Sequence, residues 1–307
     1  MAAIYRMDEN FDHGFFAHSS VTFGVFDGVH MGHRYLLQCA QDTNDAPEGK
    51  SIALTFDTDP DEMFHAQRLK KLMSNEDRIK MLSESGIDAV VVIPFTREFA
   101  ANSPEDFLRS CFGDYAPAHL HVGEDFRFGV KASGTVTELK EWGERKGCEI
   151  HAHHLVSSDG CPITATRIRK LLAACDIDEA NRLLTRRYFL HDQVRPGRGE
   201  GKDMGFKTAN LQVTHFYTTL GEGVYACYAD VDGVRYKAAV SVGVSPTFEE
   251  DSTANIEVHI LDFDQDLYQQ SIVVEFVKFL RPMIKFDSVD ELIKTVLGNI
   301  QWCRDNL

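Results

Sequence analysis

The sequence predicts two folds in one chain: an α/β domain built on a parallel sheet, then a small antiparallel β-barrel with a C-terminal helix. The 307 residues exceed what one hydrophobic core usually organises. Apolar runs alternate with helical patterns up to about residue 185, and closely spaced strands follow after about Arg187. We therefore expect a first domain over residues 1–186 and a second over residues 187–307.

The strands expected in the first domain are short apolar runs at residues 21–26, 51–56, 88–95 and 119–123. Helices are expected to begin after Ser74 and Ser103, because each hydroxyl is followed within three residues by carboxylates, and Ser103 directly by a proline. This alternation of strands and helices predicts a parallel sheet with helices on both faces.

The second domain shows the pattern of antiparallel hairpins, with strands expected at residues 223–231, 234–243, 256–263 and 271–279. Asp232-Gly233 separates the first two and is typical of a two-residue β-turn. Ser288 and Glu291 form a capping-box pattern ahead of an apolar-periodic segment, which predicts the closing helix.

The composition limits the partners of the chain. The formal net charge is −15, which argues against a nucleic-acid partner but not against small anions held by backbone amides. No apolar run reaches the roughly 18 residues of a membrane span. Seven dispersed cysteines without a Cys-x-x-Cys pair are typical of reduced thiols. We expect a cytoplasmic protein with no membrane partner; the sequence does not predict its oligomeric state.

The segment VTFGVFDGVHMGHRYLL, residues 21–37, joins a predicted strand to a predicted helix through a glycine-containing turn. Gly32 lets the backbone approach a phosphate closely, and the helix start presents unpaired amides to it. His30 and His33 can donate hydrogen bonds to charge that develops on a phosphoryl group. Two unrelated surface histidines are the alternative, but the strand–glycine–helix junction favours a phosphate site.

A second cluster is PITATRIRKLL, residues 162–172, where Thr164 and Thr166 precede Arg167 and Arg169 at the start of an apolar-periodic helix. Amides, hydroxyls and guanidinium groups together can clamp a polyphosphate. A capped surface helix explains these residues equally well when they are considered alone.

In the second domain, the segment PGRGEGKDMGFKTANL, residues 196–211, places four glycines ahead of Thr208 and Asn210. Such a loop can cover phosphates, and a hydroxyl beside an amide oxygen can bind magnesium. Glu257 shares a predicted strand face with His259, where a carboxylate can act as a general base. A plain glycine-rich turn and a solvated strand residue are the simpler alternatives.

FDGVHMGH and ITATRIR resemble the HxGH and ISSTxxR signatures of nucleotidylyltransferases. With TFDTDP, VGEDFRFG, GFKTANL, GEGVYACYADVDG and VGVSPTF, the chain resembles the bacterial bifunctional riboflavin kinase/FMN adenylyltransferase (FAD synthetase) family along nearly its whole length. The resemblance implies a Rossmann-like nucleotidylyltransferase domain followed by a riboflavin kinase-like barrel. It also implies two reactions, phosphorylation of riboflavin to FMN and adenylylation of FMN to FAD with release of pyrophosphate.

Carried over by position, the resemblance implies that His30, His33 and Arg169 act on the ATP phosphates and that Asp125 and Phe126 border the flavin. It implies nucleotide contacts at Gly24, Phe26, Gly32, Thr166, Arg167, Gly199, Gly201 and Lys202.

In the second domain the resemblance implies that Thr208 and Asn210 bind Mg²⁺ with ATP, and that Glu257 deprotonates the riboflavin 5′-hydroxyl. ATP, FMN and riboflavin are the implied small-molecule substrates. Lys207 stands where the family has a proline, and Asp59 stands where it has a histidine. Two alternatives therefore stay open: an adenylyltransferase with a weak or inactive kinase domain, and a non-catalytic flavin-binding regulator.

HAHH, residues 151–154, is a further histidine-rich motif. His151 and His153 alternate along a predicted strand and lack a carboxylate or cysteine partner at ligand spacing. The sequence therefore does not favour a metal site there.

Overall fold

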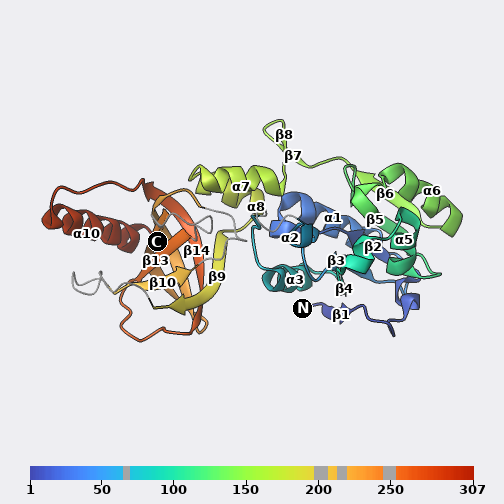
Figure 1. The fold of residues 1–307 in the computed structure, drawn as a ribbon, viewed down its shortest axis with the longest axis horizontal. Helices are drawn as coiled ribbons and strands as arrows, with labels where there is room; N and C mark the ends of the chain where they lie inside the picture. The colour runs from blue at the N-terminus through green and yellow to red at the C-terminus, as the bar shows by residue number, and fades with distance from the viewer. Residues whose placement is uncertain (65–69, 197–206, 213–219, 245–253) are drawn as a thin grey trace. The chain divides into compact units, whose positions relative to one another are not determined.

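The computed structural model describes residues 1–64, 70–196, 207–212, 220–244 and 254–307 (Figure 1). Contacts divide the chain into two compact units, Met1–Ala66 with Ser74–Thr164, and Gln67–Met73 with Ala165–Leu307. The barrel strands begin at Tyr188, and the two helices that precede them belong to the second unit. The functional boundary at 186/187 stays a prediction.

The first unit is an α/β fold, and its elements follow one another along the blue-to-green part of Figure 1. Its strands are β1 (Ala3–Arg6), β2 (Ser20–Phe23), β3 (Ser51–Phe56), β4 (Ala89–Ile93), β5 (His119–Gly123), β6 (Glu149–His153), and the small ribbon β7 (Ser157–Ser158) and β8 (Cys161–Pro162). Its helices are η1 (His13–Phe16), η2 (Asp27–Val29), α1 (Met31–Asp42), α2 (Pro60–Phe64), α3 (Asn75–Ser83), α4 (Arg97–Ala100), α5 (Pro104–Phe112), η3 (Val130–Ala132) and α6 (Val136–Lys146).

The main sheet has the order β1-β4-β3-β2-β5-β6, and every neighbouring pair is parallel. Every residue of β2, β3 and β4 is buried, as expected of parallel strands covered on both faces. The predicted strand at residues 21–26 ends earlier, at Phe23, directly before Gly24, and Phe26 adopts a left-handed backbone conformation with φ of 59°. The parallel sheet expected from the sequence is confirmed.

The predicted helix starts are confirmed. Ser74 accepts a hydrogen bond from the backbone N–H of Asp77 at 2.9 Å, and Ser103 accepts one from that of Asp106 at 3.1 Å. Each bond satisfies an amide that has no partner within its helix. These caps fix where α3 and α5 begin, and α3 carries a residue that shapes the candidate site described below.

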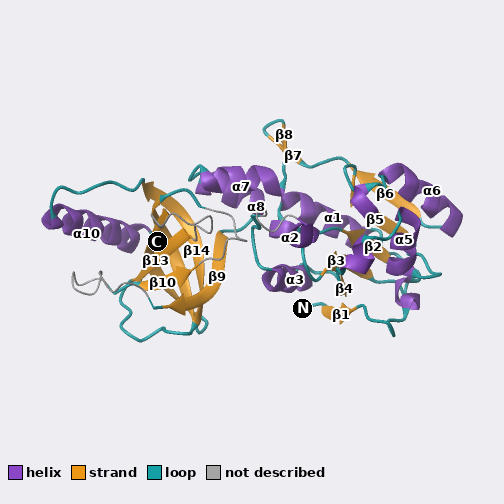
Figure 2. Ribbon diagram, viewed as in Figure 1, coloured by secondary structure: helices purple, strands orange, loops and turns teal. Residues whose placement is uncertain are grey.

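The second unit begins with two helices and continues as a closed barrel (Figure 2). Its elements are α7 (Ala165–Ala173), α8 (Ile177–Leu184), β9 (Tyr188–Arg195), β10 (Ala209–Gln212), β11 (Gly223–Val231), β12 (Val234–Val244), β13 (Ala254–Ile260), β14 (Ser271–Arg281) and α10 (Val289–Asn306). The strands close in the order β10-β13-β12-β11-β14-β9 with antiparallel pairing. The small barrel predicted from the hairpin signals is therefore confirmed.

The predicted turn and closing helix of the second unit are also present. Asp232 and Gly233 have φ of 50° and 78°, as a tight hairpin turn between β11 and β12 requires. Ser288 caps α10 by accepting from the N–H of Glu291 at 3.2 Å. The expected capping box is altered, because the Glu291 carboxylate accepts from the N–H of Asp287.

The seven cysteines all lie within the described residues, and none of them forms a disulfide. Within the described part of the chain, we find no helix whose length and apolar character would let it cross a membrane.

Candidate active sites

The parallel sheet reverses its strand order at one place. From β2 the chain proceeds to β3 and β4 on one side, whereas β5 and β6 lie on the other side of β2. Ligands of open α/β sheets bind in the crevice beyond the carboxyl ends of the strands at such a switch point. The segments that follow β2 and β5 are the two that the sequence predicts to contact nucleotide and flavin.

The segment after β2 places two imidazoles at the start of α1. His30 is extended, with φ of −72° and ψ of 175°, and is the residue from which α1 begins. His33 lies in the first turn of α1, and its ring stacks on that of His30 with centroids 3.7 Å apart. The Phe26 ring meets His33 edge-on at 5.3 Å, and Phe26 itself is 1% exposed. The turn therefore holds both imidazoles together at a helix N-terminus, where an anion is favoured.

A side chain at Gly32 would be crowded by the His30 ring. A Cβ atom there would lie 3.2 Å from Cε1 of His30 and 3.7 Å from the carbonyl oxygen of Ile163. Since Ile163 begins the ITATRIR motif, the structure brings the start of that motif against the HxGH turn. The close approach of this backbone to a phosphate, which the sequence predicts, stays a prediction.

Arg78 supports this turn and was missed by the sequence analysis. It lies on α3, is 2% exposed, and donates hydrogen bonds to the carbonyl of Val25 at 2.9 Å and to that of Phe56 at 2.7 Å. A further bond to the Thr55 hydroxyl measures 2.6 Å. One guanidinium therefore joins the segment that follows β2 to the end of β3. Arg78 lies on the same buried face of α3 as Leu82, which follows one turn later. This position on a buried helix face is the signal that could have identified Arg78.

The environment keeps His33 neutral in the ligand-free protein. Burial lowers the pKa of His33 well below its usual value, and the neighbouring His30 and Arg78 lower it further. The Nδ1 atom of His33 is inaccessible and has no hydrogen-bond partner among the described residues. A neutral imidazole at this position can donate one hydrogen bond and can accept a proton when a phosphate enters.

Asp59, which stands where the resemblance places a histidine, is also buried near this turn, with 7% exposure. Burial raises its pKa, as do the charges of Asp27 and Asp61, whereas a bond from the N–H of Asp61 and the charge of Arg78 lower it. The balance is a raised pKa, so ionisation of Asp59 costs stability in the folded protein.

We therefore expect Asp59→Asn to raise the stability of the protein at neutral pH. The folded state binds the Asp59 proton more tightly than the unfolded chain, so wild-type stability is lost as pH rises from 3.8 through the raised folded pKa. Asparagine can keep the bond from the N–H of Asp61 without the charge. Urea unfolding at several pH values should show a gain at pH 7 that vanishes below the ordinary carboxyl pKa. A variant that is less stable at pH 7 would contradict the assignment.

The segment after β5 carries the predicted flavin residues. Asp125 is exposed, and Phe126 is half-buried, with its backbone N–H donating to the carbonyl of Gly123 at 3.0 Å. The Phe126 ring packs against Phe23, the last residue of β2, with centroids 5.4 Å apart. The segment that carries Asp125 and Phe126, here called the flavin segment, and the HxGH turn at residues 30–33 therefore follow the ends of two adjacent strands.

The predicted arginines lie on α7, in the second compact unit. Arg167 pairs with Glu179 of α8 at 3.1 Å, and Thr166 is exposed at the start of α7. Arg169 is half-buried. Because the histidines belong to the first unit, the convergence of Arg169 with them around one phosphate stays a prediction.

In the barrel, the structure brings together two of the predicted kinase residues. Asn210 on β10 lies directly opposite Glu257 on β13. Directly paired residues point to the same side of a sheet, with Cβ atoms roughly 5 Å apart. Glu257 and His259 lie on the half-buried outer face of β13, whereas Val258 is fully buried. The predicted division of the two strand faces is confirmed.

Thr208 and Lys207 lie just before β10, at the rim of a cavity of about 360 Å³. Lys207 forms an ion pair with Asp264, and its carbonyl oxygen lies 2.9 Å from Nδ1 of His259. The lysine that replaces the motif proline is therefore tied to a neighbouring loop through its side chain. The remaining predicted nucleotide residues of this motif, Gly199, Gly201 and Lys202, lie outside the described residues.

Comparison with known proteins matches the two parts of the chain to two protein families. Residues 15–167 match the FAD synthetase family model, and residues 184–307 match the riboflavin kinase model. The bifunctional riboflavin kinase/FMN adenylyltransferase of Listeria monocytogenes is 32% identical over 88% of this chain and 86% of its own. The chain belongs to the bifunctional riboflavin kinase/FMN adenylyltransferase family. The enzyme of that name from Pseudomonas fluorescens is also 32% identical, over 90% of this chain and 89% of its own.

A solved structure supports the fold of this family member. A protein from Streptococcus pneumoniae, described as a macrolide-efflux protein, superposes with a TM-score of 0.81 at 26% identity, over 94% of both chains. Both units of this riboflavin kinase/FMN adenylyltransferase homologue therefore follow a known architecture.

Proposed function

We propose that this chain carries both activities of its family, adenylylation of FMN through the HxGH turn and phosphorylation of riboflavin on the barrel. The observation that carries the first activity is the stacked pair of His30 and His33 at the N-terminus of α1, beyond the carboxyl end of β2. Gly32 keeps the backbone open beside them. These features together are what binding of an ATP α-phosphate requires.

In the proposed adenylyl transfer, an oxygen of the FMN phosphate attacks the α-phosphorus of ATP. A new P–O bond forms, the bond to the β-phosphate breaks, and pyrophosphate leaves. No covalent enzyme intermediate is needed, so catalysis consists of positioning and charge stabilisation. His30 and His33 donate hydrogen bonds to the α-phosphate. The incoming negative charge raises the pKa of His33 against the effect of burial, which favours its protonated, doubly donating form.

In the proposed kinase reaction, Glu257 takes the proton of the riboflavin 5′-hydroxyl while that oxygen attacks the γ-phosphorus of ATP, and ADP leaves. The Thr208 hydroxyl and the Asn210 amide oxygen are hard oxygen donors of the kind that Mg²⁺ accepts, so these residues fit the ion that accompanies ATP. When bound, Mg²⁺ would supply charge neutralisation on the phosphates. The pairing of Asn210 with Glu257 supports this assignment.

A second candidate is an adenylyltransferase with an inactive kinase unit. It is favoured by Lys207, since a lysine does not fix φ as the motif proline would. The exposed ion pair between Lys207 and Asp264 does not fix φ, but the match of residues 184–307 to the riboflavin kinase model supports a working kinase unit. We therefore favour the bifunctional enzyme.

The test is to incubate the protein with ATP, MgCl₂ and either riboflavin or FMN, and to separate the flavins by chromatography. We expect riboflavin to yield FMN and then FAD, and FMN to yield FAD. Formation of FAD from FMN without FMN from riboflavin would select the second candidate. If neither flavin were converted, the result would select the alternative of a non-catalytic flavin-binding protein.

A further inference from the structure

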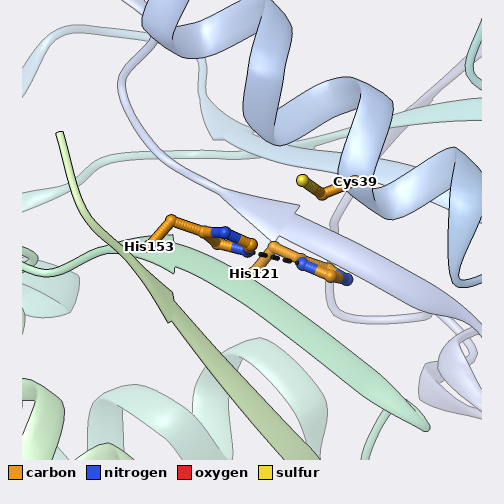
Figure 3. Close-up of side chains that lie close together, drawn as sticks. All are labelled: Cys39, His121 and His153. Carbon is orange, nitrogen blue, oxygen red and sulfur yellow. Dashed lines mark hydrogen bonds between the residues drawn. The ribbon is translucent and has the colours of Figure 1, made fainter. Parts of the chain in front are cut away.

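The HAHH motif belongs to a larger cluster that the reactions above do not use. β5 and β6 are parallel neighbours, with His121 opposite His151 and Gly123 opposite His153. His119 and His121 alternate along β5 as His151 and His153 do along β6, so all four imidazoles lie on one face of the sheet. α1 packs on β5 and contributes Cys39 near this face (Figure 3).

Three of these side chains surround a common point. The Sγ of Cys39 and one ring nitrogen each of His121 and His153 all lie within 4.8 Å of one another. Nδ1 of His121 is 2.9 Å from Nε2 of His153, the contact marked by the dashed line in Figure 3. Donor atoms around one tetrahedral zinc ion lie roughly 3.3–3.7 Å apart, given bonds of about 2.0–2.3 Å. Small side-chain adjustments would therefore enclose an ion.

The remaining nitrogen of His121 already has the partner that a metal ligand needs. Nε2 of His121 lies 2.8 Å from Oγ1 of Thr43, and that hydroxyl donates to the carbonyl of Cys39 at 2.9 Å. Oγ1 of Thr43 therefore accepts a hydrogen bond from Nε2–H of His121, which leaves the lone pair of the ring on Nδ1, directed at His153. Metal-binding histidines almost always donate their second N–H in this way.

Burial also suits His121 to this role. It is 1% exposed, and burial lowers its pKa to about 3, with further lowering by His151, His153 and His119. The imidazole is thus neutral and able to coordinate at neutral pH. Cys39 and His153 are half-buried, so an ion can reach the cluster from solvent. Tyr35 covers one side, with its ring 5.3 Å from that of His153.

We propose that Cys39, His121 and His153 bind a divalent ion of the zinc class, with solvent as the fourth ligand. One thiolate with two imidazoles favours Zn²⁺ over harder cations such as Mg²⁺. The neighbouring group of His119, Glu149 and His151 is the rival site. Its carboxylate is mostly exposed, and it lacks both a thiolate and a buried imidazole like that of His121.

The bound ion would join α1 to β5 and β6 at a distance from the reacting phosphates. α1 carries His33 in its first turn and Cys39 near its end, and β5 leads directly to Asp125. The ion would brace the frame that carries the HxGH turn and the segment with Asp125. This inference does not depend on the proposed reactions.

The test is to titrate the full-length, metal-free protein with Co²⁺ and record the thiolate-to-cobalt charge-transfer absorption. We expect a band that saturates at one equivalent and is displaced by Zn²⁺. Cys39→Ala and His153→Gln should abolish it, whereas Cys161→Ala, which removes an exposed cysteine, should leave it unchanged. Thr43→Val should weaken Co²⁺ binding by about 10–100-fold.

Control measurements separate loss of ligands from loss of folding. The metal-free variants should melt within a few degrees of the metal-free wild type, because Cys39 and His153 are only half-buried. Added Zn²⁺ should raise the melting temperature of the wild type but not of His153→Gln. A band that survives Cys39→Ala, a band abolished by His119→Gln with Glu149→Gln, or no band in the wild type would overturn the proposal.

Discussion

His30→Ala is expected to slow the conversion of FMN to FAD by about 10²–10³-fold, the usual loss when one preorganised donor to a developing oxyanion is removed. FMN formation from riboflavin should keep its wild-type rate, because the kinase residues lie on the barrel. His33→Ala should have a similar effect, since the two rings stack at 3.7 Å and act on the same phosphate. Steady-state assays with each flavin separately measure both rates.

His18→Asn is the matched control for this experiment. It removes an exposed histidine of the same unit, and asparagine tolerates the φ of 60° at this position. His30 is buried, so the variants must also be compared with the wild type by thermal unfolding. Undiminished FAD synthesis in a folded His30→Ala protein would remove the basis of the proposed adenylyl transfer.

Glu257→Gln is expected to reduce FMN formation from riboflavin by about 10²–10⁴-fold, the range that a general base contributes. Glutamine keeps the shape and half-buried position of the side chain but cannot take the hydroxyl proton. Asn210→Ala should reduce the same reaction, because Asn210 pairs with Glu257 across β10 and β13. FAD formation from supplied FMN should be unaffected in both variants.

Asp232→Asn provides the carboxylate-to-amide control on the same barrel, at the hairpin turn where asparagine accepts the φ of 50°. It should leave both reactions unchanged. If Glu257→Gln lowered FAD formation from FMN as much as FMN formation, the two sites would not be independent and the division of labour proposed here would fail.

Local patterns predicted most of the fold. β3 and β4 are nearly continuous apolar runs, the hairpin turn is an Asp-Gly pair, and the starts of α3 and α5 carry serine caps. β1, whose four residues are all exposed, lacks such a signal. The error at Phe26 arose because a left-handed residue inside an apolar run has no local signal that distinguishes it from a strand residue. In that conformation the Phe26 ring contacts the ring of His33, a residue of α1.

Side chains that act through distant partners were less predictable. In the sequence, Arg78 cannot be distinguished from an ordinary helix residue. Its role is evident only from its hydrogen bonds to the carbonyls of Val25 and Phe56 in the structure. From the sequence, HAHH is expected to have no carboxylate or cysteine partner at ligand spacing, which is wrong, because Glu149 lies two residues from His151 on the same strand and Cys39 is supplied by α1. A search limited to local spacing cannot find a ligand supplied by another element.

The hydrogen bonds of Arg78 bear on how this turn can vary between relatives. Two of its partners are main-chain carbonyls, a group that every amino acid carries. Substitutions in the turn can therefore change side chains without removing the guanidinium's acceptors. A departure such as Asp59 leaves both acceptors in place, because neither carbonyl belongs to residue 59, whereas a change at Arg78 on α3 would remove both hydrogen bonds.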